Sequence, residues 1–222
     1  MKATTQRCRG RNHPEITISY DPEKVIAPDV EWLLRWLEHE VASGKCFRPG
    51  ETVQIGWMIT QVQFPVDGKS ALFEPDMEAF PIKFVDSITQ TLTHLRLQKS
   101  VAESVGLAED MSFPSLRHSA LVCNKLNAAT DFIMDRAEPE AADSGWFIGC
   151  NDPTHSHQDA PNLERVSLYE VGRRLLPRSI IYFALPAGVS VECSNKTPRI
   201  FREQRELSIR PGSFLDLRRS AP

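Results

Sequence analysis

The sequence lacks the short motifs that identify most nucleotide-binding proteins and serine hydrolases. It contains neither G-x-G-x-x-G nor G-x-x-x-x-G-K-[ST], so nothing supports a phosphate cradle. Ser144 comes nearest to a nucleophile elbow, but Ala142 and Trp146 stand where G-x-S-x-G requires glycine. We expect Asp143, Ser144 and Gly145 to form a turn instead, because Asp and Ser bond nearby backbone and glycine accepts positive φ.

Long apolar runs and paired cysteines are also missing. No stretch approaches the roughly 20 apolar residues of a membrane helix, and residues 1–14 lack the apolar segment of a secretory signal. The cysteines are odd in number and widely spaced, with no C-x-x-C, which favours reduced thiols. They are Cys8, Cys46, Cys123, Cys150 and Cys193. We therefore expect a cytoplasmic protein.

The 222 residues carry no overall basic excess. The formal net charge is −3, which argues against a dedicated nucleic-acid binder. The charge is uneven, since residues 131–164 hold eight acidic and one basic side chain, whereas residues 196–222 hold seven basic and three acidic. Such asymmetry bears on partners rather than on fold. We expect a protein partner, and neither nucleic acid nor a membrane.

Hydrophobic periodicity predicts helices and strands in the first half of the chain. Apolar residues at helical spacing indicate two helices, and alternation indicates a strand whose phase changes near Thr60, as at a bulge. The predicted elements are a helix over 28–43, a strand over 52–64, a turn at Asp67-Gly68, a return strand over 69–73 and a helix over 81–105. Together they predict two helices and a hairpin.

The second half is richer in strands. Short apolar or alternating runs predict strands over 119–123, 131–136, 145–148, 180–185 and 189–193, and a helix over 167–176. We expect an α+β protein in which the first unit packs on a mainly antiparallel sheet with a covering helix. The expected divisions are a flexible arm (1–22), an α+β unit (23–113), a second α+β domain (114–205) and a basic tail (206–222).

One cluster has the chemistry of a metal or thiol site: Cys150, Asp152, His155 and His157. Zinc accepts sulfur, nitrogen and oxygen donors, but structural sites usually take ligands from two arms, and no second arm is visible. Cys123 and Cys193 would have to supply it through the fold. We favour a solvated polar loop, and predict no metal and no cofactor. A catalytic Cys150–His157 pair stays open and needs a third, orienting group.

The stretch from Ser119 to Arg202 resembles a known family. Its signature is Asp143-Ser144-Gly145-Trp146, then Phe147-Ile148-Gly149 and Asp152, after the strands Ala120-Leu121-Val122 and Ile133-Met134-Asp135-Arg136. This is similar to the predicted immunity-protein domain family 33 of bacterial polymorphic toxin systems. The resemblance implies a protein made beside a toxin, which binds and silences it without catalysis. The sequence departs from the family pattern after the tryptophan, where Pro153, His155 and His157 accompany Asp152 in place of a dense acidic run.

An inhibitor needs anchors and complementary charge, which the acidic region offers. The candidate partner-binding residues are Glu138, Glu140, Asp143, Trp146, Asp152, His155 and His157. Trp146 has two interpretations, a core residue or an exposed anchor. If the toxin cuts nucleic acid, the acidic segment would occupy the place of phosphates. The alternative function is a metal- or thiol-dependent hydrolase centred on Cys150, His155 and His157.

Overall fold

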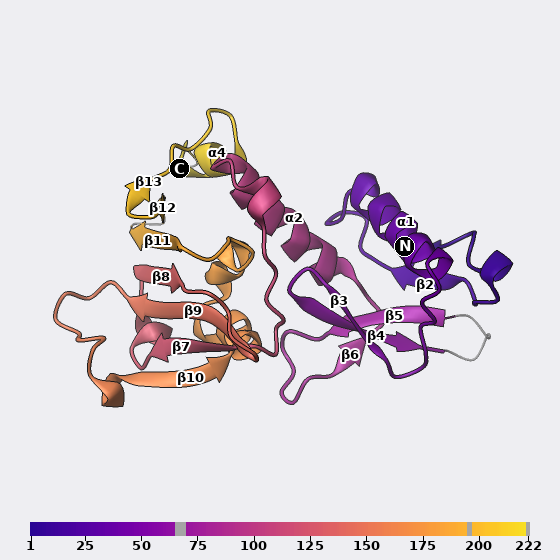
Figure 1. Cartoon of the computed structure of the whole chain (residues 1–222), viewed down its shortest axis with the longest axis horizontal. Coiled ribbons are helices and arrows are strands. Elements are labelled where there is room, and N and C mark those ends of the chain that lie inside the picture. The colour runs from indigo at the N-terminus through magenta and orange to yellow at the C-terminus, as the bar shows by residue number, and fades with distance from the viewer. Residues whose placement is uncertain (65–69, 195–196, 221–222) are drawn as a thin grey trace. The chain divides into compact units, whose positions relative to one another are not determined.

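A computed structural model describes residues 1–64, 70–194 and 197–220 (Figure 1). The predicted α+β class is confirmed, and the chain forms two compact units, Met1–Arg96 and Leu97–Pro222. The division falls inside helix α2 (Thr89–Ser104), earlier than the boundary predicted after residue 113. The helix is continuous and contains no glycine or proline, so no local signal marks the division. Among the described residues, no helix has the length and apolar character needed to cross a bilayer.

The first unit is built on a six-stranded sheet in the order β1-β2-β5-β4-β3, with β6 paired to β5. Its pairs are antiparallel except β2–β5. The strands are β1 (Lys2–Thr4), β2 (Ile16–Ser19), β3 (Thr52–Ile55), β4 (Met58–Gln63), β5 (Ser70–Pro75) and β6 (Phe84–Val85).

Helix α1 (Ala27–Ala42) covers this sheet, as its periodicity predicts. Its buried face consists of Val30, Leu33, Leu37 and Val41, which share one core with the inward residues of the strands. Burial of such side chains contributes about 1.5–3 kcal/mol each. The helix ends before Gly44, whose φ of 100° suits the turn that stops it.

The first 22 residues are not the arm that their polar composition predicts. Strands β1 and β2 pair within the sheet, and Ile16 and Ile18 are fully buried. The N-terminal amino group of Met1 donates to the Tyr20 carbonyl at 2.6 Å. The arm was predicted wrongly from polar composition, whereas the alternation of Ile16-Thr17-Ile18, which allows a strand, is confirmed by β2.

The strand predicted over residues 52–64 is a hairpin. Strands β3 and β4 pair antiparallel, with Ile55 opposite Met58, so the chain reverses at Gly56-Trp57. Gly56 has a φ of 61°, which permits the tight turn. The change of phase that suggested a bulge near Thr60 reflects this reversal. The turn predicted at Asp67-Gly68 lies outside the described residues.

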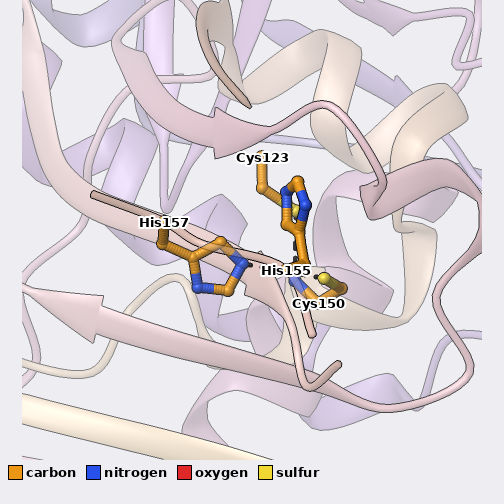
Figure 2. Close-up of side chains that lie close together, drawn as sticks. All are labelled: Cys123, Cys150, His155 and His157. Atoms are coloured by element: carbon orange, nitrogen blue, oxygen red, sulfur yellow. Dashed lines mark hydrogen bonds between the residues drawn. The ribbon is translucent and has the colours of Figure 1, made fainter. Parts of the chain in front are cut away.

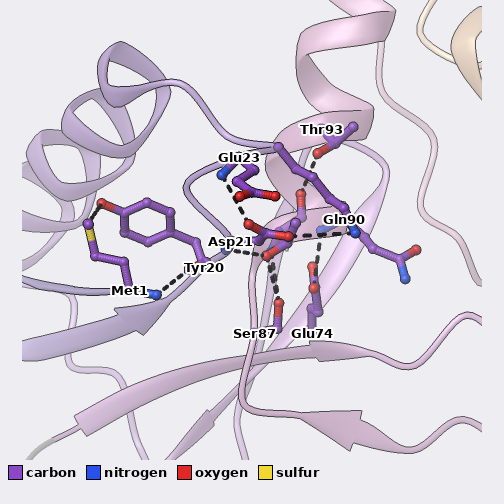
Figure 3. A network of polar contacts seen from close by, with 10 residues as sticks. Met1, Tyr20, Asp21, Glu23, Glu74, Ser87, Gln90 and Thr93 are labelled. Atoms are coloured by element: carbon purple, nitrogen blue, oxygen red, sulfur yellow. Dashed lines mark hydrogen bonds and ion pairs between the residues drawn. The ribbon is translucent and has the colours of Figure 1, made fainter.

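Helix α2 begins at Thr89 rather than at Pro81, because Phe84–Val85 pair with β5 as strand β6 before the helix starts. Its first turn is held by Glu74 of β5, a 2% exposed side chain that accepts from the backbone amides of Gln90 (3.1 Å) and Thr91 (2.7 Å). Figure 3 shows Glu74 beneath Gln90 in a wider polar network. A carboxylate stabilises the positive end of a helix, so a distant strand fixes the start of α2.

The second unit is built on a seven-stranded sheet in the order β10-β7-β9-β8-β11-β12-β13. It is mainly antiparallel, as predicted, and β7–β9 is its parallel pair. The strands are β7 (Ser119–Cys123), β8 (Phe132–Arg136), β9 (Asp143–Cys150), β10 (Leu163–Ser167), β11 (Val189–Ser194), β12 (Thr197–Arg202) and β13 (Arg205–Glu206).

The predicted helix near 167–176 is present as α3 (Leu168–Glu170), which continues into a π-helical turn (Val171–Leu175). The strand predicted over 180–185 was wrong, because Pro177–Tyr182 is a 3₁₀ helix. A short buried apolar run fits either state. In the basic tail, α4 (Phe214–Ser220) buries Leu215. The other 3₁₀ helices are Arg9–Arg11, Ala108–Asp110, Leu126–Ala128 and Ala160–Asn162.

Candidate functional site

Two cysteines meet at one edge of the second sheet because their strands are parallel. Cys123 ends β7 and Cys150 ends β9, and Val122 lies opposite Ile148 in the register. Parallel strands bring their carboxyl ends to the same edge. The two cysteines, 27 positions apart in sequence, therefore become neighbours, and the backbone N–H of Cys150 donates to Cys123 Sγ at 3.2 Å.

The connection from β9 to β10 adds two histidines to this pair. Strands β9 and β10 flank β7 on either side, so residues 151–162 must pass over the carboxyl end of β7. His155 and His157 lie in this connection. One ligand atom from each of the four residues Cys123, Cys150, His155 and His157 lies within 4.8 Å of the others (Figure 2).

The cluster is tightly packed. Cys150 Sγ lies 3.6 Å from His157 Nε2, and the rings of His155 and His157 meet edge to face with centroids 5.1 Å apart. Phe147 packs edge-on against His157 at 5.4 Å. A Cβ at Gly149 would come within 2.9 Å of the His157 ring, so glycine is what lets the imidazole approach the strand.

Burial sets the electrostatics of the cluster. Cys123 and Cys150 are 1% and 4% exposed, and burial raises the pKa of the Cys123 thiol. Desolvation lowers the pKa of His157, and the neighbouring His155 lowers it further. His155 Nε2 is a buried nitrogen without a hydrogen-bond partner among the described residues. Both causes favour the neutral imidazole of His157.

Asp152 was predicted to belong to the same cluster, but its carboxylate bonds to Thr154 instead. Its carboxylate accepts from the Thr154 backbone amide at 2.8 Å and from the Thr154 hydroxyl at 2.7 Å. These bonds lower the pKa of Asp152, and Lys125 at 3.5 Å contributes to the same shift. Asp152 therefore shapes the turn that leads into the histidines. Cys193, on β11, lies two strands from β9 and is outside the group.

The opposite end of β9 carries the D-S-G-W stretch, which lies in the strand itself and not in the predicted turn, although the predicted local bonds are present. Asp143 forms an ion pair with Arg165 and accepts from the Gly145 amide at 2.7 Å and the Ser119 hydroxyl at 2.9 Å. Gly145 has a φ of 77°, and a Cβ there would lie 2.2 Å from the Ala137 carbonyl oxygen. The stretch therefore has an identifiable structural role.

Trp146 is a core residue, which decides between its two interpretations. It is 1% exposed, and its indole N–H donates to the Phe183 carbonyl at 3.2 Å. Trp146 was predicted as a partner-binding residue, and its buried side chain is inaccessible to a partner in this structure. Alternation along β9 explains the burial, because Trp146, Ile148 and Cys150 point to the same face.

Glu138 and Glu140 are exposed at the same end of the strand. They line a surface hollow of about 500 Å³ together with Asp143 and Arg165. This end lies about 23 Å from Cys150, at about 3.3 Å per residue along β9. The predicted partner-binding residues therefore separate into two groups, Glu138, Glu140 and Asp143 at one end, and Asp152, His155 and His157 at the other.

Sequence reasoning missed the role of Arg136. This side chain is 3% exposed, and burial lowers its pKa to about 10. Its guanidinium stacks over Trp146 at 5.5 Å and donates to the carbonyls of Ser112, Ser144, Phe183 and Leu185. Arg136 is the single basic residue within residues 131–164, so every exposed charge in that segment is acidic.

Comparison with known proteins supports one resemblance. Residues 97–202 match the family model of the Imm33-like domain, in agreement with the resemblance drawn from the D-S-G-W stretch. The match begins at Leu97, where the second compact unit also begins. No curated protein and no solved structure matches the chain.

Proposed function

From the Imm33-like segment we infer that the protein is an immunity-type protein, which binds a cognate bacterial toxin and neutralises it by direct contact. The family match over residues 97–202 is the observation that carries this proposal. The match covers strands β7 to β12, which are six of the seven strands of the second sheet, so this sheet is the part that would bind the toxin.

The acidic hollow is the surface that best suits a partner of this kind. Glu138 and Glu140 are exposed and line it, and the buried Arg136 leaves the exposed charges of residues 131–164 uniformly acidic. Charge complementarity accelerates encounter and selects partners. A basic toxin surface fits this charge. For a toxin that cuts nucleic acid, the glutamates would take the place of phosphates in its cleft.

Charge reversal at the hollow tests the proposal. Glu138→Lys with Glu140→Lys should slow association with the toxin at least tenfold at low salt, because steering charges act mainly on the on-rate. It should also weaken the salt dependence of binding. The measurement is association kinetics with the toxin encoded by the neighbouring gene. Unchanged rates at all salt concentrations would reject this surface.

Two matched variants locate the effect. Glu109→Lys reverses one exposed charge of the same unit outside the acidic segment, and compared with Glu138→Lys alone it should leave the rate nearly unaltered. Asp152→Lys tests the distant end of β9 separately. A full-length protein that fails to bind or protect against the toxin under any condition would refute the immunity function itself.

A thiol-dependent hydrolase is the competing function, favoured by the 3.6 Å separation of Cys150 Sγ and His157 Nε2. A hollow of about 370 Å³ adjoins Cys150. Among the described residues, however, no hydrogen bond orients His157 as a catalytic base requires. Toxin neutralisation that survives Cys150→Ser would exclude a thiol nucleophile. Its loss, with rapid alkylation of Cys150 at neutral pH, would favour the hydrolase.

A further inference from the structure

We propose that Cys123, Cys150, His155 and His157 bind one Zn²⁺ ion as a closed, structural site. This goes beyond the proposed function, because nothing in toxin binding requires a metal. The site is assembled by topology. The parallel pair β7–β9 brings the cysteines together, and the connection from β9 to β10 lays the histidines over them.

The distances suit a tetrahedral ion. In a zinc site with Zn–S of about 2.3 Å and Zn–N of about 2.0–2.1 Å, ligand atoms lie about 3.3–3.8 Å apart. Cys150 Sγ and His157 Nε2 already lie 3.6 Å apart, and all four ligand atoms lie within 4.8 Å of one another. The widest separation therefore exceeds the ideal by at most about 1.5 Å. Small rotations of side chains can close it.

The donor set points to zinc among the common metal ions. Two sulfurs and two imidazole nitrogens form the Cys₂His₂ set of structural zinc sites. Magnesium and calcium prefer oxygen ligands, and Asp152, the carboxylate two positions after Cys150, is engaged by Thr154. Four protein ligands leave no position open for water or substrate, so the site would stabilise structure rather than catalyse hydrolysis.

Three features around the cluster suit a bound metal ion. His155 Nε2 is buried without a hydrogen-bond partner, which is unfavourable unless another ligand satisfies the ring. The Cys150 amide donates to Cys123 Sγ, a bond that stabilises a thiolate. Gly149 leaves the space into which His157 fits. Each is consistent with a built site rather than with a chance grouping on a polar loop.

The ion would fasten the connection between β9 and β10 to the end of β7. Outside the cluster, this connection is bonded to neighbouring elements near its two ends, through Asn151 Nδ2 to Ser194 Oγ at 3.2 Å and through the Asn124 amide to the Asn162 carbonyl at 2.9 Å. Metal binding contributes to folding free energy because the unfolded chain offers no preformed site. Asp152 and the exposed faces of the histidine loop would then be held in one conformation.

Metal analysis of the full-length protein, purified without chelator, tests the proposal. We expect about one zinc per chain. Cys123→Ser and His157→Asn should each lose most of that zinc, whereas Cys193→Ser, a buried cysteine in the same sheet, should retain it. A zinc content near zero in the wild type, or full zinc in Cys123→Ser, would overturn the assignment. So would another metal held by these residues.

Measurements on the wild type keep the test independent of variants that misfold. After removal of zinc under reducing conditions, Co²⁺ should give the visible bands of a tetrahedral ion and a near-ultraviolet thiolate-to-cobalt band. Zinc added back should raise the melting temperature in a concentration-dependent way, because it binds the folded state. Absence of both effects refutes the site. A Cys123–Cys150 disulfide in the freshly isolated protein, detected by mass after alkylation, also refutes it.

Discussion

The two ends of strand β9 differ in how they are constructed. At the amino end, the side chains of Asp143 and Ser144 accept from backbone amides two residues further on, and Asp143 also pairs with Arg165 of β10. At the carboxyl end, Cys150 meets Cys123 from a neighbouring strand and two histidines from the following connection. The first end therefore combines bonds between residues close in sequence with bonds to neighbouring strands. The second end has both thiols only when the sheet has formed.

The largest expected effect is at the buried tryptophan of the amino end. Trp146→Ala should lower the free energy of unfolding by about 3–5 kcal/mol, because it leaves a cavity beneath Arg136 and removes the bond to the Phe183 carbonyl. Urea denaturation gives the value. Trp32→Ala, at a tryptophan that is 43% exposed, is the matched control and should cost much less. Comparable losses in the two variants would contradict the core assignment.

The next effect concerns Gly145 at the same end of β9. Gly145→Ala should cost about 3 kcal/mol, since it combines positive φ with a Cβ placed 2.2 Å from the Ala137 carbonyl oxygen. Gly188→Ala is the control, because its φ of 79° is similar but its Cβ would meet open space. It should cost only about 1 kcal/mol. Thermal or urea unfolding of both variants separates the free-energy cost of the clash from the cost of the positive φ. An equal loss of stability in the two variants would argue against the clash.

The smallest effect on stability, and the sharpest contrast, is expected at Gly149 of the other end. Here the added Cβ meets the movable rings of His157 and Phe147 instead of backbone. Gly149→Ala should displace His157, cost about 1 kcal/mol in the metal-free protein, and reduce zinc content at least severalfold. Metal analysis beside urea denaturation measures both. A variant that keeps its zinc would show that the imidazole does not depend on this glycine.

Local signals allowed much of the fold to be predicted. The helix over residues 28–43, the positive φ of Gly145 and the antiparallel character of the second sheet follow from periodicity and local chemistry, whereas the turn expected at Asp143-Ser144-Gly145 is part of strand β9. The failures have physical causes. Gly56-Trp57 reverses the chain without a common hairpin dipeptide, and Ile180-Ile181-Tyr182 is apolar enough to be read as a strand although it forms a 3₁₀ helix.

The candidate site was predictable only in part. Cys150, His155 and His157 stand close in sequence and their chemistry was recognised, but the spacing lacked a second arm. Cys123 supplies that arm from 27 positions away, and Cys193 was an equal candidate by sequence. Trp146 could be core or contact until its burial was known. Spacing cannot separate these cases, because each depends on which strands become neighbours.

Residues close together in the chain were enough to specify the elements whose hydrogen bonds and apolar faces are local, and composition set the acidic bias of residues 131–164. The folded sheet was needed to make β7 and β9 parallel, to bring Cys123 to Cys150, and to place the glutamates and histidines at opposite ends of one strand. The reason is that strand order and direction are selected by burial of the whole sheet. No single segment carries that free energy in its own residues.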